Sequence, residues 1–426
     1  MHDLVRAHTS THTPPSLHPH HLDAAQTRLL NHYTETTGQA HEHLAALPGQ
    51  AVPPRFTGRQ DALRWLDAER ANLIATVTHA ATTGYHTHTA RLGTALARYL
   101  LWRRHLADWV TVATHAHTSA THLTPHHQAS TATILGLALQ EVRRFEEAIT
   151  AHQHARTLYQ EAGDRHSEGM AWNNLGLALR AVRRFDEAIT AHQHARTLYQ
   201  ETGDRHSEGK AWGNLGNALQ EVRRFDEAIT AHQHARTLFQ ELGDRHGEGT
   251  TWNNLGNALR AVRRFDEAIT AHQHALAICQ DMGDRNGEGR AWNNLGLALQ
   301  EVRRFDEAIT AHQHALAICQ DMGDRHGEGT TWNNLGLALR AVRRFDEAIT
   351  AHQHALAICQ DMGDRHGEGM AWGNLGLALR EVRRLNEAAQ CWEQAQAAFT
   401  DTDDLDNVEY VAGLLRGLPP PPEPTL

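Results

Sequence analysis

The chain has almost no lysine, and this absence comes with a net negative charge. Lys210 is the only lysine among 426 residues, so arginine supplies nearly all of the basic groups. The formal net charge is −10 with the histidines neutral. Phosphate binding requires a basic surface, so the composition argues against nucleic acid as the main partner.

Long apolar runs are also lacking. No stretch of about 18 or more apolar residues occurs, which argues against a transmembrane helix. The segment 1–19 is rich in histidine and threonine and contains no apolar signal core. We therefore expect a cytoplasmic protein that makes no membrane contact.

Cysteine is scarce, and its placement follows a period. The chain has four cysteines, and the first three recur every 40 residues: Cys279, Cys319, Cys359 and Cys391. Equivalent atoms of stacked repeats lie on the order of 10 Å apart, which is too far for a disulfide. We expect buried, reduced thiols that act as small hydrophobic groups.

Signatures of catalysis are missing as well. The nearest match to a phosphate-binding loop runs from Gly203 to Lys210, but the spacing of its glycines is wrong and Ala211 follows the lysine. No Ser-His-Asp arrangement on a sharp turn and no His-Glu-x-x-His helix is found. We expect no enzyme, no catalytic residue and no cofactor.

The main feature that is present is an internal repeat of 40 residues. A Leu-Gly pair recurs at this interval from Leu135-Gly136 to Leu375-Gly376, so seven units span residues 131–410. The two helices of one unit cannot bury their apolar faces by themselves. Stacking the units buries these faces against neighbouring units, which predicts a solenoid.

The unit 283–323 shows the pattern of one repeat. Apolar residues follow helical spacing on both sides of Arg303-Arg304, which predicts two antiparallel helices of about 15–18 residues. Gly323 is suited to end the second helix, and Asp324 is suited to cap the next one. Small residues such as Gly296 allow the two helices to approach closely, and we expect Trp292 and Phe305 to fill the adjoining space.

These residues resemble the tetratricopeptide repeat family. Trp292-x-x-Leu295-Gly296 and Phe305-Asp306-Glu307-Ala308 match its pattern, although the usual unit has 34 residues. The longer unit is similar to those of kinesin light chains and of spindle-orientation adaptors with Leu-Gly-Asn repeats. The resemblance implies an all-α, right-handed superhelical solenoid of antiparallel helix pairs. It also implies a concave groove, lined by the first helix of each pair, that binds a protein or an extended peptide.

A second resemblance lies before the repeats. Met1-His2-Asp3 is similar to a signature of NB-ARC signal-transduction ATPases, and Phe56–Leu73 is similar to the segment that follows the ATPase in bacterial regulators of this class. We interpret residues 1–21 as a disordered remnant of a winged-helix end and residues 22–130 as a helical region. That region contains a degenerate repeat at 86–126, and residues 411–426 end the capping helix and form a Pro-rich tail.

An asparagine before each Leu-Gly pair is the first candidate binding feature. In the family this position faces the groove, where an amide can both donate to and accept from a peptide backbone. The alternative is that each amide bonds a neighbouring helix or water. The candidates are Asn174, Asn214, Asn254, Asn294, Asn334 and Asn374.

A row of arginine and glutamine further along the same helices is the second candidate. Over most of the array it alternates, and so does the next residue, Ala or Glu, which gives a superperiod of 80 residues. The charges could meet a ligand of mixed charge or pair with each other across repeats. The row consists of Arg180, Gln220, Arg260, Gln300, Arg340 and Arg380.

The abundance of histidine, 35 residues, suggests metal binding as an alternative. His312 and His314 form a His-x-His pair that recurs in the middle units, but residues two apart on a helix point about 200° apart. One metal ion therefore cannot take both. We expect His312 to pack where the family often places an aromatic ring, and His314 to face solvent. The cluster His18, His20 and His21 could hold a metal ion only loosely.

The sequence thus predicts a protein- or peptide-binding scaffold or sensor in bacterial signalling, with possible self-association through the ends of the array. Two alternatives remain open. One is a truncated NB-ARC regulator that acts with a separate ATPase chain, and the other is a histidine-rich metal-binding protein.

Overall fold

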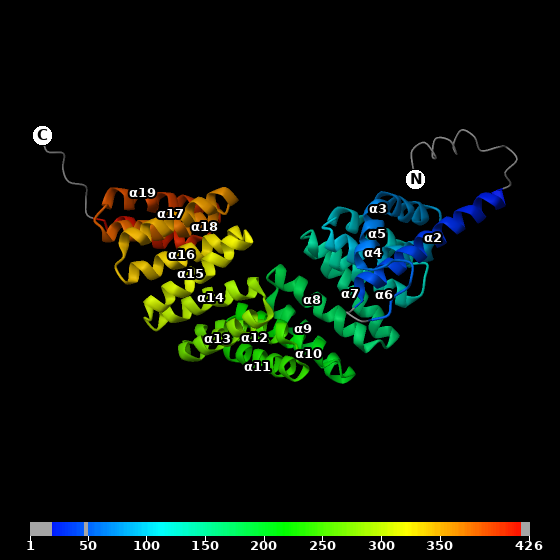
Figure 1. Ribbon diagram of the computed structural model, residues 1–426, viewed down its shortest axis with the longest axis horizontal. Coiled ribbons are helices and arrows are strands. Elements are labelled where there is room, and N and C mark those ends of the chain that lie inside the picture. The colour runs from blue at the N-terminus through cyan, green and yellow to red at the C-terminus, as the bar shows by residue number, and fades with distance from the viewer. Residues whose placement is uncertain (1–18, 47–49, 419–426) are drawn as a thin grey trace, which may run out of the picture. The chain divides into compact units, whose positions relative to one another are not determined.

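The computed structural model describes residues 19–46 and 50–418, and every regular element within them is an α-helix (Figure 1). The chain divides into two compact units, Met1–Ala218 and Leu219–Leu426. Within the described ranges, no helix combines the length and the apolar character that crossing a bilayer requires.

Among the described residues of the first unit, four helices precede the regular repeats. Their bounds, followed by those of the repeat helices, are α2 (Pro19–Ala45), α3 (Arg59–Thr82), α4 (His86–Trp102), α5 (Leu106–Ala120), α6 (Pro125–Glu141), α7 (Phe145–Ala162), α8 (Arg165–Ala181) and α9 (Phe185–Thr202). The boundary between the units falls within α10 (Arg205–Glu221).

The second unit continues the same alternation. Its helices are α11 (Phe225–Leu242), α12 (Arg245–Ala261), α13 (Phe265–Met282), α14 (Arg285–Glu301), α15 (Phe305–Met322), α16 (Arg325–Ala341), α17 (Phe345–Met362), α18 (Arg365–Glu381), α19 (Leu385–Asp401) and α20 (Leu405–Arg416). From α11 to α20 each helix packs on the next one, as α14 does on α15 and α15 does on α16. The predicted all-α solenoid of helix pairs is confirmed.

The helix ends have the predicted chemistry. Gly323 ends α15 in the left-handed conformation, with φ 67°, which a residue without Cβ adopts at no steric cost. Asp324 then caps α16, because its carboxylate accepts a hydrogen bond of 3.0 Å from the backbone nitrogen of Gly327. The turn inside the repeat is less ordinary, because Arg303 has φ 61° and glycine does not occupy that position.

The two helices of a repeat cross at a glycine, and a histidine fills the space. A Cβ added at Gly296 would lie 2.6 Å from Cε1 of His312, which is fully buried. Trp292 and Phe305, which we expected to fill the adjoining space, are half-buried.

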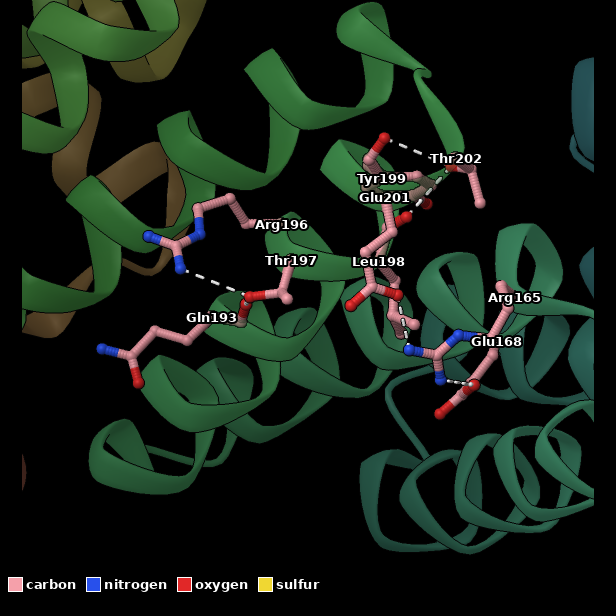
Figure 2. Close-up of polar contacts among 9 residues, drawn as sticks. All are labelled: Arg165, Glu168, Gln193, Arg196, Thr197, Leu198, Tyr199, Glu201 and Thr202. Atoms are coloured by element: carbon pink, nitrogen blue, oxygen red, sulfur yellow. Dashed lines mark hydrogen bonds and ion pairs between the residues drawn. The ribbon is translucent and has the colours of Figure 1, made fainter.

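The two helices of a repeat are also joined by ion pairs. Arg165 at the start of α8 donates to Glu168 at 3.0 Å and to Glu201 of α9 at 2.6 Å (Figure 2). Glu168 is almost completely buried, whereas Glu201 is exposed. The exposed partner adds little stability, since surface pairs contribute about 0–1 kcal/mol.

The helices before the regular repeats have their own apolar core, which includes Leu66, Tyr99 and Trp109. The helices α4 and α5 pair within the segment 86–126, where we placed a degenerate repeat. The Met1-His2-Asp3 motif and the Pro-rich tail from residue 419 lie outside the described residues, and so does His18 of the N-terminal histidine cluster.

Candidate peptide-binding face

The candidate site lies on the first helices of the second unit, α12, α14, α16 and α18, which contact one another in sequence order. We call their common surface the first-helix face. The unit's repeats are nearly identical here, so each feature of the face recurs at an interval of 40 residues.

Three pockets recur on this face, one at each junction between successive repeats. Their volumes are about 410, 330 and 280 Å³ in chain order, and we call them the first, second and third pockets. Each pocket is lined by the C-terminal end of a second helix, which contributes an isoleucine, a cysteine and a methionine. In chain order these are Ile278, Cys279 and Met282, then Ile318, Cys319 and Met322, then Ile358, Cys359 and Met362.

The methionines give the pockets an exposed apolar rim. Met282, Met322 and Met362 are each about half accessible, at 46%, 46% and 47%. Large apolar side chains in a soluble protein are normally covered, and methionine is common at surfaces that adapt to different partners. These methionines were not among the predicted site residues, although their recurrence at the end of each second helix was a visible signal.

Four of the predicted asparagines donate to the first asparagine of the Asn-Asn pair in the preceding repeat. The Nδ2 of Asn294, Asn334 and Asn374 donates to the Oδ1 of the asparagine 41 residues earlier, at 3.0, 3.1 and 3.1 Å. In the first unit, Asn214 donates to Asn173 in the same way at 3.0 Å. These bonds leave one N–H and the carbonyl oxygen of each donor amide for another partner.

Two of the predicted asparagines lack this bond, because Thr133 and Gly213 occupy the position 41 residues earlier. In the part of the chain that the structure describes, the side-chain amides of Asn174 and Asn254 form no hydrogen bond. The groove role of the six asparagines stays a prediction.

The neighbouring asparagine of each pair lies nearer to the pockets. Asn253, Asn293 and Asn333 line the first, second and third pockets, whereas Asn334 is the one predicted asparagine among the lining residues of these pockets. The Asn-Asn pair in the sequence was the signal for these residues, and we used only its second member.

The glutamines of the predicted row bind the buried histidines. The Nε2 of Gln220 and of Gln300 donates to Nε2 of His232 and of His312, each at 2.8 Å. The same amides donate to the backbone oxygens of Asn254 and Asn334 in the following repeat, at 3.2 and 3.3 Å. These two glutamines thus join repeats to each other.

In the Arg260 and Arg340 repeats an asparagine binds the histidine instead. Nδ1 of His272 lies 3.2 Å from Oδ1 of Asn253, and Nδ1 of His352 lies 3.0 Å from Oδ1 of Asn333. In the second unit the superperiod therefore corresponds to two ways of binding one buried imidazole, whereas in the Arg180 repeat neither ring nitrogen of His192 has a hydrogen-bond partner among the described residues.

Two arginines of the row, Arg260 and Arg380, form ion pairs with glutamates. Nη1 of Arg260 lies 3.9 Å from Oε1 of Glu301 in the next repeat, and Nη2 of Arg380 lies 3.7 Å from Oε1 of Glu381. Arg180 lies close enough to His192, and Arg340 to His352, for its charge to lower the pKa of that histidine. Pairing across repeats thus occurs at Arg260.

Burial sets the electrostatics beneath the face. It lowers the pKa of His232 and of His312 to about 4, because a charged imidazole there would lose its hydration. Burial, together with the arginine of the same repeat, lowers the pKa of His272 to about 3. Burial also raises the pKa of the Cys319 and Cys359 thiols, and all four cysteines are free and buried, as predicted.

The second histidine of several His-x-His pairs is exposed and stacks on the repeat's tryptophan, as His194, His274, His314 and His354 do. The rings of His314 and Trp292 have centroids 4.6 Å apart and planes 23° apart. Thus His312 is buried and His314 reaches solvent, as predicted. Within residues 19–46 and 50–418, no three His, Cys, Asp or Glu side chains are grouped to hold a metal ion.

Arg290 is the one cation that breaks the regularity of the pocket rims. It lines both the first and the second pocket, where the equivalent residues of the flanking repeats are Thr250 and Thr330. Its side chain is exposed, and among the described residues it takes part in no ion pair.

The sequence pattern of the tetratricopeptide repeat matches residues 127–201, 207–281, 287–361 and 327–401, which is more than half of the chain. The chain is a tetratricopeptide repeat protein. A search of the curated proteins found no significant match.

Solved structures share the fold of this tetratricopeptide repeat protein. A signal transduction ATPase with numerous domains and a tetratricopeptide repeat sensor, from Pyrococcus horikoshii, is 10% identical with a TM-score of 0.59, over 89% of this chain and 65% of its own. The apo quorum sensor NprR from B. thuringiensis is 12% identical with a TM-score of 0.58, over 86% of this chain and 99% of its own. A Rap protein complexed with Competence and Sporulation Factor is 10% identical with a TM-score of 0.54, over 89% and 99% of the two chains.

Proposed function

We propose that this tetratricopeptide repeat protein binds a protein segment on its first-helix face, as the sensing or scaffolding part of a bacterial signalling system. The observation that carries the proposal is the recurrence of three apolar pockets beside side-chain amides with unused hydrogen-bonding groups. Apolar pockets with a few polar groups at the rim are typical of binding sites.

The comparisons support the signalling context. One similar structure is described as a sensor attached to an ATPase, one as a quorum sensor, and one contains a bound Competence and Sporulation Factor. Four free thiols fit a reducing compartment, and we place the protein in the cytoplasm. Because tetratricopeptide solenoids are generally non-catalytic, the proposal assigns no reaction to the chain.

The experiment is affinity capture from a native lysate with the full chain and two matched variants. The first variant, Met282→Ser/Met322→Ser/Met362→Ser, removes the apolar rims without touching the core. The control, Leu405→Ser/Tyr410→Ser, changes two exposed apolar residues of α20, away from the pockets. Partners that the control retains and the first variant loses support the proposal, and equal recovery by all three proteins contradicts it.

A further inference from the structure

The spacing of the pockets limits which ligand can fill them together. Each pocket is separated from the next by one first helix, and packed helices lie about 8–10 Å apart. An extended chain advances about 3.3 Å per residue, so three residues span one pocket interval. An apolar side chain at every third position of such a chain would meet consecutive pockets.

The amides beside the pockets fit an extended backbone. Oδ1 of Asn253 accepts from Asn294 and from His272, and within the described residues the Nδ2 of Asn253 and the Oδ1 of Asn294 have no partner. One donor and one acceptor are thus presented side by side, which matches the C=O and N–H groups of an extended peptide. A helical ligand satisfies its own backbone groups and cannot use them.

The charge at the rim adds a further requirement. Arg290 is exposed between the first and second pockets and has no carboxylate partner within the described residues. The other arginines that line the pockets, Arg245 of the first and Arg325 of the third, are paired with Glu248 and Glu328 at 2.7 and 2.8 Å. Arg290 is therefore available to a carboxylate of the ligand.

We propose that the first-helix face takes an extended peptide with an apolar side chain at every third residue and an acidic residue between two of these apolar positions. The inference rests on the proposed function and adds the chemistry of the ligand. The apolar side chains enter the three pockets, the backbone pairs with the asparagine amides, and the acidic residue pairs with Arg290.

The test is fluorescence anisotropy of labelled synthetic peptides with the full chain. The probe peptides carry three leucines at intervals of three residues among serines, with one glutamate in either the first or the second gap, because the direction of the bound chain is open. Control peptides have the same composition with leucines at intervals of two or four. We expect at least tenfold tighter binding at the interval of three, for one of the two glutamate placements.

A charge reversal separates the acidic contact from general attraction. Arg290→Glu should weaken binding of the glutamate peptide about tenfold and tighten binding of the same peptide with lysine in place of glutamate. Arg303→Glu makes the same charge change in the turn after α14, away from the pockets, and should leave both affinities unchanged.

Equal affinity at all three intervals overturns the inference, and so does an Arg290→Glu variant that binds both peptides like the wild type. Absence of binding to every peptide overturns it as well. The capture experiment does not use these peptides, so retention of partners there would keep the proposed function while the ligand pattern fails.

Discussion

The imidazole of His312 occupies the space that a side chain at Gly296 would need, since a Cβ there would lie 2.6 Å from its Cε1. The same contact recurs between Gly256 and His272 and between Gly336 and His352, each at 2.5 Å. Each of these repeats is therefore held together by a polar ring packed directly on backbone.

This contact predicts a large effect for one added methyl group. Gly296→Ala should lower the free energy of unfolding by about 1–3 kcal/mol, because the histidine must leave its position in a packed core. Urea denaturation followed by circular dichroism measures the loss. Gly373→Ala is the matched control, since nothing lies within 4 Å of a Cβ at that helical glycine. It should gain about 0.5–1 kcal/mol, and a comparable loss in both variants would contradict the close-packing account.

The buried histidines predict acid sensitivity. Their pKa is lowered on folding from 6.5 to about 4 for His312 and to about 3 for His272, so the unfolded chain takes up protons that the folded chain refuses. Their contribution to stability is complete above pH 6.5 and falls as the pH drops toward 4. Each such histidine lowers the free energy of unfolding by about 1.4 kcal/mol per pH unit in that window.

Denaturation midpoints measured between pH 4 and pH 8 check this dependence. His312→Phe removes one titrating ring, and an aromatic ring is tolerated at this position, because Trp392 occupies it in the last repeat and is fully buried against Gly376. The variant should show a shallower pH dependence than the wild type. A midpoint that stays constant between pH 6.5 and pH 4.5 is the result that contradicts the prediction.

The turn inside the repeat predicts a stabilising substitution. Arg303 has φ 61°, a conformation that costs a residue with a Cβ about 1–2 kcal/mol, so Arg303→Gly should raise the melting temperature. Arg304→Gly is the control, since Arg304 has an ordinary φ of −82° and its guanidinium donates two hydrogen bonds to the carboxylate of Glu307. It should lower the melting temperature, and the same direction of change in both would refute the argument.

Two asparagines separate binding from stability. Asn294→Ala removes a hydrogen bond of 3.0 Å to the buried Asn253 and should cost about 1 kcal/mol of stability. Asn254→Ala removes an amide without a partner in the described ranges and should leave the melting temperature unchanged. If the first-helix face binds a backbone, both variants should weaken partner binding in the anisotropy assay. Loss of binding in Asn294→Ala alone would assign its effect to packing.

The 40-residue period and the turn residues were sufficient to predict the helix pairs, because Gly323 and Asp324 act locally on the chain. The burial of His312 was also predicted, but only because the resemblance places an aromatic ring at that position. Helical spacing alone places Trp292 and His312 near the crossing alike. The close fit of the imidazole against Gly296 depends on three-dimensional shape, which the spacing of residues does not give.

The candidate site was predicted in part. The asparagine and arginine/glutamine rows were correctly located on the first helices, but their partners come from the neighbouring repeat or the second helix, as with Gln300 and His312. The pockets require Met322 at the end of one repeat and Thr330 on the first helix of the next repeat to meet at a repeat junction. Such a meeting depends on how repeats stack, which no single repeat specifies.

The alternation of Gln300 with Arg260 and Arg340 also limits how the array can change in length. Gln300 reaches forward to the backbone oxygen of Asn334, which a repeat of either kind supplies, whereas Arg260 reaches forward to Glu301, which only the other kind of repeat supplies. Removing 40 residues would bring two repeats of one kind together and leave the arginine beside an alanine, whereas removing 80 would restore every contact. Natural variants of the array should therefore gain or lose repeats two at a time, so that their lengths differ by multiples of 80 residues.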